Sequence, residues 1–396
     1  MTDTDDGRDA ASTDGPRSVA VTGLGRYVPD EVLAGETVAE RSGIPEAVVV
    51  EKMGLREKRV CPPDEDHCSD MAVTAARRAL ADAGYALGPD ATADPLGDAA
   101  VDADAERDDA GARDAERDGA GGDSDPARDA GDLDLVLYHG SEYKDYVVWS
   151  AAADVADRVG AAGAFATESY TLCAGAPIAL RQVRSQLLAG DVDRALLVSA
   201  SREEDLVDYG TEDASFMFNF GSGASAMVLE AAPDADRTRA RVLESGAVTD
   251  GDFSRDVIMP AGGSVAPPTR DTVEKGLHAL DVPNHESMKE RLGEVTLDNF
   301  LSVADEALAG SGYDREDVDF VALTHMKRSF HEHLVEALGD PADYYLDEYG
   351  HVQSVDQVLA VDEALDRGLL ESGDVVLFLA AGTGYTWAAT VLEWVG

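Results

Sequence analysis

Residues 348–394 read EYGHVQSVDQVLAVDEALDRGLLESGDVVLFLAAGTGYTWAATVLEW. A glycine and a histidine lead into a helical pattern, which is followed by a Val- and Leu-rich run, a Gly-Thr-Gly turn and a last apolar run. Short continuous apolar runs rich in Val and Leu are typical of strands that are buried on both faces of a sheet. The stretch therefore predicts a helix followed by two buried strands, as in an α/β fold.

Similar units occur earlier in the chain. Three segments of the first half match three segments of the second half in the same order: 133–142 with 318–327, 190–201 with 372–382, and 220–230 with 382–394. A repeated order of strand, helix and strand indicates two copies of one structural unit. We therefore predict an α/β fold of two similar halves, at residues 17–235 and 236–396.

Two tracts have a composition that cannot form a core. Residues 1–16 are polar and acidic, and residues 88–132 are nearly all Ala, Asp, Gly and Arg without an aromatic residue. We predict that both are disordered. Because a helical pattern precedes 88–132 and a strand pattern follows it, we interpret this tract as an insertion inside the first half.

The charge of the chain is strongly unbalanced. There are 79 Asp and Glu against 32 Lys and Arg, which gives a formal net charge of -47, and the acids are spread over every segment. Such a surface repels itself unless salt screens it, so the composition indicates adaptation to a very salty cytoplasm. It also argues against a nucleic-acid partner, because binding phosphates requires clustered Lys and Arg.

The cysteines and the N-terminus indicate the compartment. Cys61, Cys68 and Cys173 form neither an even disulfide framework nor a CxxC pair, which favours a reducing environment. The first residues lack the pattern of a signal peptide, and no uncharged apolar run approaches the ~20 residues of a membrane span. We predict a cytoplasmic protein that does not enter a membrane.

Cys173 lies at the predicted start of a helix. Apolar residues follow it at the spacing of one buried helix face: Ala176, Ala179, Leu180, Val183 and Leu187. Pro177 suits the first turn of this helix and Gly190 suits its end. The unpaired N–H groups at a helix N-terminus favour a thiolate. The position indicates a nucleophile; the alternative is a small buried core residue.

Two histidines and a glutamate are predicted close to Cys173. When the two halves are aligned, His351 matches Cys173. If the halves pack about a pseudo-twofold axis, the two helix starts converge on one pocket. His325 ends a predicted strand, and Glu142 follows the matching strand of the first half. Ligands of α/β sheets bind beyond the carboxyl ends of the strands. A thiol, two imidazoles and a carboxylate there would suffice for covalent acyl transfer.

A metal site is not predicted. His331 and His333 are two positions apart on a predicted helix, so they would point to different faces. We interpret both as surface residues.

These segments together resemble the thiolase superfamily, in its branch of ketoacyl-acyl-carrier-protein synthase III and hydroxymethylglutaryl-CoA synthase. The resemblance covers nearly the whole chain apart from the two acidic tracts. The segments that carry it are VTGLGRYVPDEVL (21–33), EKMGLREKRV (51–60), CAGAPIAL (173–180), FGSGASAMVLE (220–230) and the block at 348–394. It implies a five-layer fold of two similar halves, normally a homodimer.

The resemblance also implies an activity. Cys173 would take an acyl group from a CoA or acyl-carrier-protein thioester, and a second thioester would supply the carbanion of a Claisen condensation. His325 falls on the family's catalytic histidine. The oxyanion hole would combine the backbone N–H of Cys173 with the turn at Thr383 and Gly384. The thioesters are substrates, so neither a cofactor nor a metal is implied.

Two departures keep the substrate class open. His351 stands where ketoacyl synthase III has an asparagine, and it is similar to the second histidine of elongating ketoacyl synthases. The segment HGSEY (139–143) resembles the part of hydroxymethylglutaryl-CoA synthase that holds its catalytic glutamate. Glu142 would then deprotonate an acyl-enzyme, and the reaction would join acetyl-CoA to acetoacetyl-CoA. A non-condensing acyltransferase or a thioester-binding scaffold is the third alternative.

Carrier and partner contacts are marked more weakly. By the resemblance Lys52 falls near the CoA nucleotide, where Val48 replaces a stacking aromatic residue. Lys327 and Arg328 are local positive charges that could meet the phosphates of CoA or of a carrier protein. Some archaeal relatives use a small zinc-ribbon partner protein, so such a partner is a further possibility.

Overall fold

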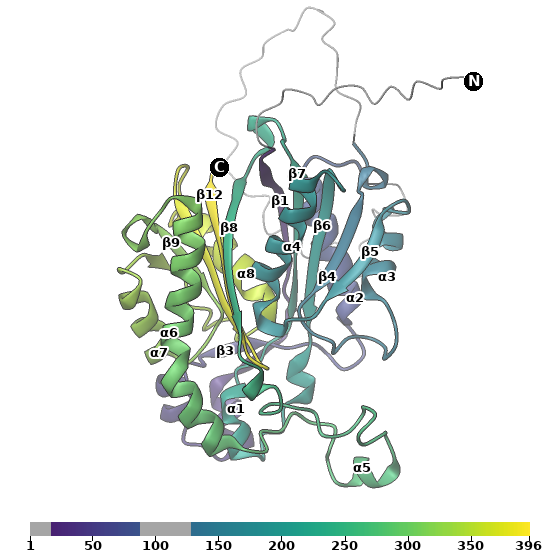
Figure 1. Cartoon of the computed structure of the whole chain (residues 1–396). Coiled ribbons are helices and arrows are strands. Elements are labelled where there is room, and N and C mark those ends of the chain that lie inside the picture. Colours follow the sequence, from purple (N-terminus) through teal and green to yellow (C-terminus); the bar gives the residue numbers. More distant parts are fainter. Residues whose placement is uncertain (1–16, 88–127) are drawn as a thin grey trace, which may run out of the picture.

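The computed structural model describes residues 17–87 and 128–396 (Figure 1). Its main sheet has ten strands in the order β10-β9-β11-β12-β8-β1-β7-β6-β4-β5, and a second sheet pairs β2 with β3. The strands are β1 (Val19–Tyr27), β2 (Val32–Ala34), β3 (Glu57–Arg59), β4 (Leu135–His139), β5 (Phe165–Ser169), β6 (Arg194–Ser201), β7 (Gly223–Ala231), β8 (Ala240–Thr249), β9 (Phe320–Leu323), β10 (Ala342–Asp343), β11 (Val375–Gly382) and β12 (Thr386–Trp394). The α-helices are α1 (Gly35–Ser42), α2 (Cys68–Asp82), α3 (Ala151–Val159), α4 (Gly175–Ala189), α5 (Arg270–Glu274), α6 (His285–Ser311), α7 (Arg328–Ala337) and α8 (Asp356–Asp366).

The main sheet is pseudo-symmetric about its centre. Outward from β1 the order is β7, β6, β4 and β5, and outward from β8 it is β12, β11, β9 and β10. In each half the first two pairings are antiparallel and the last two are parallel. A short antiparallel pairing of β1 with β8 joins the halves. The predicted internal repeat is therefore present in the strand order.

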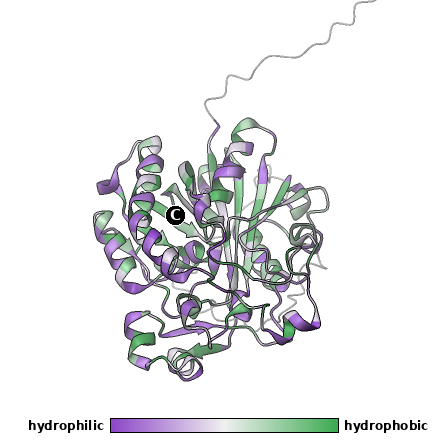
Figure 2. Ribbon diagram, turned by 60° about the horizontal axis from the view of Figure 1, so that its bottom comes forward, coloured by the Kyte–Doolittle hydropathy of each residue, from purple (hydrophilic) through white to green (hydrophobic). Residues whose placement is uncertain are grey.

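The helices complete five layers. Helices α2 and α3 cover the outer face of the first half-sheet, and α6 and α7 cover the outer face of the second. The apolar faces of α4 and α8 share one core with the inner faces of both half-sheets, so these two helices form the middle layer. Figure 2 shows that the central strands are mostly hydrophobic, as burial on both faces requires. The α/β fold of five layers is confirmed.

Most predicted elements are present, and the differences have physical reasons. Seven short apolar runs predict buried strands, at 18–25, 133–140, 194–201, 223–231, 318–325, 374–382 and 386–394. All seven form, as β1, β4, β6, β7, β9, β11 and β12. Strands β5 and β8 carry polar and half-exposed residues, so they gave no continuous apolar run. The predicted boundary at residues 235/236 falls in a 3-10 turn, Ala235–Arg237, between β7 and β8.

The two acidic tracts lie almost entirely outside the described residues. The exception is 128–132, where the prediction of disorder is wrong. The carbonyl of Arg128 accepts the backbone N–H of Ala86 at 2.7 Å, and its guanidinium lies 3.4 Å from Glu230. A capping box between Asp129 and Asp132 then leads the chain toward β4. No helix in the described ranges is long and apolar enough to cross a membrane.

Candidate active site

Cys173 lies at the start of the buried middle helix, as predicted. It is the central residue of a 3-10 turn, Leu172–Ala174, that leads directly into α4, and it is 4 % exposed. The helix ends at Gly190, which adopts the left-handed conformation with φ 80°. The predicted apolar face of α4 is buried. The fold thus places the thiol at the N-terminal end of α4, where the helix dipole favours a negative charge.

Glycines let other segments approach this turn closely. A Cβ on Gly382, at the end of β11, would lie 2.2 Å from the carbonyl oxygen of Thr171 and 3.2 Å from the backbone nitrogen of Cys173. A Cβ on Gly175 would lie 2.8 Å from the Cβ of Ser354, which precedes α8. Only glycine fits such contacts, so these positions bring the second half against the Cys173 turn.

His351 meets Cys173 across the two halves. Its Nε2 atom lies 3.1 Å from the Sγ atom of Cys173, and the Oε1 atom of Gln353 lies 2.9 Å from the same sulfur. The predicted convergence of the two segments is therefore present, but the predicted alignment is not. Leu172 and Gln353 open the two matching 3-10 turns, with φ 51° and 57°, so Ser354 rather than His351 is the structural counterpart of Cys173.

A buried carboxylate lies behind His351. The Nδ1 atom of His351 is 2.6 Å from Oδ2 of Asp356, whose side chain is fully buried. Burial lowers the pKa of His351, but Asp356 and Cys173 outweigh burial and hold this pKa well above its usual range. The ring therefore carries a positive charge at neutral pH. The sequence interpretation did not single out Asp356.

His325 lies in the same pocket with the opposite electrostatics. It is 4 % exposed, and neither ring nitrogen has a hydrogen-bond partner among the described residues. Its ring packs on Tyr345 with centroids 4.6 Å apart. Burial, with the nearby charges of His351, His331 and Arg328, holds the pKa of His325 well below its usual range. It is a neutral imidazole with both nitrogens free to bind a substrate.

Cys173, His325 and His351 open into one cavity of about 650 Å³. Its walls are largely apolar, and part of them comes from the two segments 202–220 and 250–300. The apolar and aromatic lining residues from those segments are Phe216, Phe220, Met288, Leu292 and Phe300. An apolar cavity with a few polar groups at its end suits a small molecule with a hydrocarbon part.

The turn after β11 was predicted to supply part of an oxyanion hole. Thr383 lines the cavity together with Cys173, whereas Gly384 is not among the lining residues. Gly382 is the glycine of this turn that abuts the backbone of Cys173. The turn thus places backbone next to the thiol, where N–H groups can stabilise negative charge on a substrate oxygen.

Positive side chains lie along the cavity as well. Lys52 and Lys327 line it, as does Lys289, which the sequence interpretation missed. Lys52, Lys289 and Lys327 therefore line one cavity. Arg328 is not a lining residue: it lies 2.7 Å from Asp347 and stacks on Tyr345 at 4.0 Å. A substrate phosphate would meet the lysines rather than this guanidinium.

The predicted carboxylate, Glu142, and a second carboxyl group, Glu203, differ in placement. Glu142 is exposed and does not line the cavity. Glu203, the second residue after β6, is 5 % exposed, and its electrostatic neighbours include His351. Burial raises the pKa of Glu203 to about 7, although Ser141 and His351 both act to lower it. Beside Asp356, Glu203 and not the predicted Glu142 is thus a carboxyl group that interacts electrostatically with His351.

The surface assignment of His331 is wrong. It is 4 % exposed, and its Nε2 atom lies 2.7 Å from Oδ2 of Asp343 on β10. This side chain packs edge-on against Tyr345, beneath His325. His333 is exposed, as predicted. Within residues 17–87 and 128–396, no group of His, Cys, Asp and Glu is arranged to hold a metal.

Comparison with protein families gives two matches. Residues 168–251 match the model of 3-oxoacyl-[acyl-carrier-protein] synthase III, and residues 308–394 match the model of the C-terminal part of the same synthase. Similar curated proteins include the β-ketoacyl-[acyl-carrier-protein] synthase III of Caldanaerobacter subterraneus, 25% identical over 95% of this chain and 98% of that protein. The protein of the same name from Erythrobacter litoralis is 27% identical over 95% of this chain and 99% of its own length.

Solved structures give the same fold. The 3-oxoacyl-(acyl carrier protein) synthase III of Pseudomonas aeruginosa superimposes with a TM-score of 0.71 at 21% identity, over 96% of this chain and 99% of that chain. The priming β-ketosynthase of the R1128 polyketide pathway has a TM-score of 0.72 at 21% identity, over 97% and 99%. The two family models and the curated relatives make this chain similar to 3-oxoacyl-[acyl-carrier-protein] synthase III, and the solved structures show the same fold.

Proposed function

We propose that Cys173 is the nucleophile of an acyl-thioester condensing enzyme, and therefore of an acyltransferase. The synthase III relatives and the two family models support this activity. The observation that carries the residue assignment is the 3.1 Å distance between Sγ of Cys173 and Nε2 of His351, at the end of an apolar cavity. A thiol and an imidazole in contact are the parts of an activated sulfur nucleophile.

The reaction would have two stages. The sulfur of Cys173 attacks the carbonyl carbon of an acyl thioester, and the carrier leaves as a thiol. A second thioester then enters the cavity and becomes a carbanion by losing carbon dioxide from a malonyl group. The carbanion attacks the carbonyl of the acyl-enzyme, the bond between the acyl carbon and Sγ of Cys173 breaks, and the cysteine leaves as a thiolate. The free, neutral ring of His325 can donate a hydrogen bond to the carbonyl of the second thioester and so stabilise the carbanion. The backbone at Cys173 and Thr383 would stabilise the oxyanion.

Mass spectrometry of the intact protein tests the first stage. The chain is incubated in molar salt with acetyl-CoA and with longer acyl-CoAs, beside Cys173→Ala and the buried-thiol control Cys61→Ala. We expect an acyl adduct on the wild type and on Cys61→Ala, and none on Cys173→Ala. The absence of an adduct from every acyl-CoA and acyl carrier protein offered would refute the proposal.

Product analysis separates the alternatives. Offering malonyl-CoA should give a carbon-carbon product with release of carbon dioxide, as ketoacyl synthase III-like chemistry requires. The hydroxymethylglutaryl-CoA synthase-like reaction needs a protein carboxylate close to the acyl group on Cys173. The exposed position of Glu142 does not favour this reaction. An acyl-enzyme that gives no carbon-carbon product would instead identify a non-condensing acyltransferase.

The carrier is proposed to be CoA or an acyl carrier protein. Both present a phosphopantetheine arm, and Lys52, Lys289 and Lys327 line the cavity that would receive it. In a chain with a net charge of -47, three lysines in one place form a local positive region for a phosphate.

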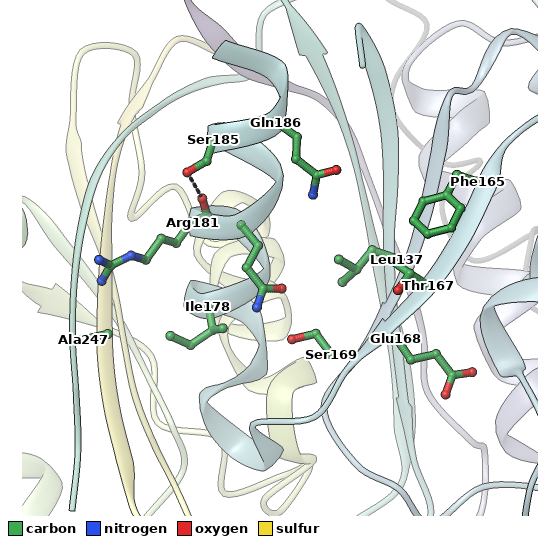
Figure 3. Close-up of a pocket in the computed structure, with 11 residues that line it drawn as sticks. Leu137, Phe165, Thr167, Glu168, Ser169, Ile178, Arg181, Ser185, Gln186 and Ala247 are labelled. Carbon is green, nitrogen blue, oxygen red and sulfur yellow. Dashed lines mark hydrogen bonds between the residues drawn. The ribbon is translucent and has the colours of Figure 1, made fainter. Parts of the chain in front are cut away.

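A homodimer is proposed from the edge of the sheet. Strand β5 is hydrogen-bonded only to β4 in the described structure, and its Phe165 is 67% exposed. A hollow of about 720 Å³ lies beside it. Figure 3 shows the residues that line this hollow, among them Phe165 and Thr167 of β5 and Ile178 and Arg181 of α4. An open strand edge with apolar residues favours pairing with a second copy of the chain. Light scattering in molar salt should give twice the chain mass, and Phe165→Asp should give monomer; a wild-type monomer would refute the pairing.

The remaining predictions concern the cell. With so many acidic residues, we propose that the protein needs molar salt, and full stability in dilute buffer would refute this. The cytoplasmic location and a zinc-ribbon partner stay predictions from the sequence.

A further inference from the structure

The carboxylate of Asp356 contacts both catalytic histidine segments. Its Oδ2 atom lies 2.6 Å from Nδ1 of His351 and also accepts the backbone N–H of His325 at 2.7 Å. Its Oδ1 atom accepts the backbone N–H of Val352 at 2.7 Å. One side chain at the start of α8 therefore fixes the ring of one histidine and the backbone of the other.

The burial of this carboxylate determines the charge of its partner. Asp356 is 0% exposed, and its ion pair in the described structure is with His351. A buried carboxylate without a compensating charge is strongly unfavourable, so a proton on the imidazole is favoured. The hydrogen bond at Nδ1 also leaves Nε2 as the atom that faces the sulfur of Cys173.

We propose that Asp356 is the positioning residue of this site, and that it keeps His351 as an imidazolium and Cys173 as a thiolate before any substrate binds. This rests on the proposed function of Cys173. The thiol proton then resides on Nε2 of His351. When the thiolate attacks an acyl thioester, the bond between the acyl carbon and the carrier sulfur breaks. The departing thiolate takes the proton from Nε2, and His351 is left neutral beside the acyl-enzyme.

The other groups around His351 are compatible with its positive charge. His325 is held neutral, in part by the charge of His351. Glu203 is a buried carboxyl group on the other side, and Lys or Arg side chains form no ion pair with Asp356 in residues 17–87 and 128–396. The amide of Gln353, 2.9 Å from the sulfur, can present its NH2 group to a thiolate after rotation by half a turn.

The arrangement assigns the two histidines different tasks. His351 shares its proton with Cys173 and serves acylation, whereas the unpaired ring of His325 remains available to the second substrate. A single asparagine at position 351 could not hold a proton for the leaving thiol. His351 stands where synthase III has an asparagine. The carboxylate of Asp356 accompanies this histidine and enables it to take the proton of the thiol.

Alkylation of Cys173 tests the role of Asp356 without any substrate. The rate of reaction with iodoacetamide is followed by peptide mass spectrometry between pH 5 and 9.5, in molar salt, for the wild type and Asp356→Asn. Because only the thiolate reacts, we expect Asp356→Asn to move the midpoint of the rate profile upward by about one pH unit or more, and to slow the reaction at pH 6 about tenfold. At pH 9.5 the two rates should converge.

Two further variants separate positioning from general damage. Asp343→Asn makes the same change in another Asp-His pair, that of the half-buried Asp343 with the buried His331, and should leave the profile of Cys173 unchanged. Asp356→Glu, which keeps the charge, should move the midpoint less than Asp356→Asn. Profiles of Asp356→Asn and wild type that superimpose would overturn the proposal.

A second measurement uses only the wild type and Cys173→Ala, in case Asp356→Asn does not fold. The thiolate absorbs near 240 nm, so the difference spectrum at pH 6 should contain one thiolate. No difference at pH 6 would overturn the proposal. The acyl-CoA experiment above is independent, so a failure of the proposed function would be distinguished from a failure of this inference.

Discussion

His325 and His351 line the same cavity, yet their environments shift their pKa values in opposite directions. Burial disfavours the charged form of both rings, but only His351 has a carboxylate in contact with its ring. The result is one neutral and one protonated imidazole within one site. Two titratable groups with divergent pKa values are typical of acid-base catalysis.

Replacing each histidine should therefore block a different stage. We expect His351→Ala to reduce the rate of acyl-enzyme formation by about a hundredfold or more, because the leaving thiol loses its proton donor. His325→Ala should still form the acyl-enzyme but lose carbon-carbon bond formation to a similar extent. Rapid-quench mass spectrometry and product assays measure the two stages, with the exposed His333→Ala as control. Equal loss of acylation in both variants would contradict the division of tasks.

Glu142→Gln should change the condensation rate by less than about twofold, because this side chain is exposed and outside the cavity. The assay is steady-state product formation with acyl-CoA and malonyl-CoA. A large loss of condensation with acylation intact would instead restore the hydroxymethylglutaryl-CoA synthase-like mechanism.

Glu203→Gln should stabilise the protein in a pH-dependent manner. Because burial raises the pKa of Glu203 to about 7, the native state keeps a proton that the unfolded chain loses above its ordinary pKa near 4.5. The wild type therefore loses stability as the pH rises between these values, and the glutamine variant does not. The free energy of unfolding of the variant, relative to that of wild type, should rise by on the order of 3 kcal/mol between pH 4.5 and pH 8.

Denaturant unfolding in constant salt at several pH values measures the free energy of unfolding of Glu203→Gln and of wild type. Taking the difference between the two cancels the pH dependence of all other groups. Glu142→Gln is the matched control, since an exposed carboxylate should give no such gain. A stability difference between Glu203→Gln and wild type that stays constant with pH would contradict the assignment.

Gly382→Ala should slow acylation by about tenfold or more. The added methyl group would lie 2.2 Å from the carbonyl of Thr171, so the strand must move away from the turn that carries Cys173. Acyl-enzyme formation and the thermal midpoint are measured together. Gly293→Ala is the control, because a Cβ there meets no atom within 4 Å. Acylation at the wild-type rate would show that the close contact is dispensable.

Lys289→Glu should raise KM for acyl-CoA about tenfold and leave KM for the corresponding acyl-pantetheine unchanged, because only the former carries phosphates. Lys275→Glu, at an exposed lysine that does not line the cavity, should change neither value. An equal rise in KM for both substrates would point to a change in cavity shape rather than to a lost phosphate contact.

Several features could be predicted locally. Continuous Val- and Leu-rich runs identified seven strands, and the apolar periodicity after Cys173 identified α4, since each depends on burial of nearby residues. Strand β8 was missed because its exposed and buried residues alternate unevenly within the sheet centre. The internal repeat gave the two halves, but short matches could not fix its register, so His351 was aligned where Ser354 belongs.

The α/β fold of two halves and the candidates Cys173, His325 and His351 could be predicted from the sequence, because hydrophobic periodicity and helix-start position are local properties. Which groups act on one another depends on the tertiary packing. Asp356, Gln353 and Glu203 carry no local pattern; their contacts with the site come from packing α8 and the end of β6 against a turn that is distant in sequence. Charge states in a buried site follow from those distances, and distances between remote segments are set by packing alone.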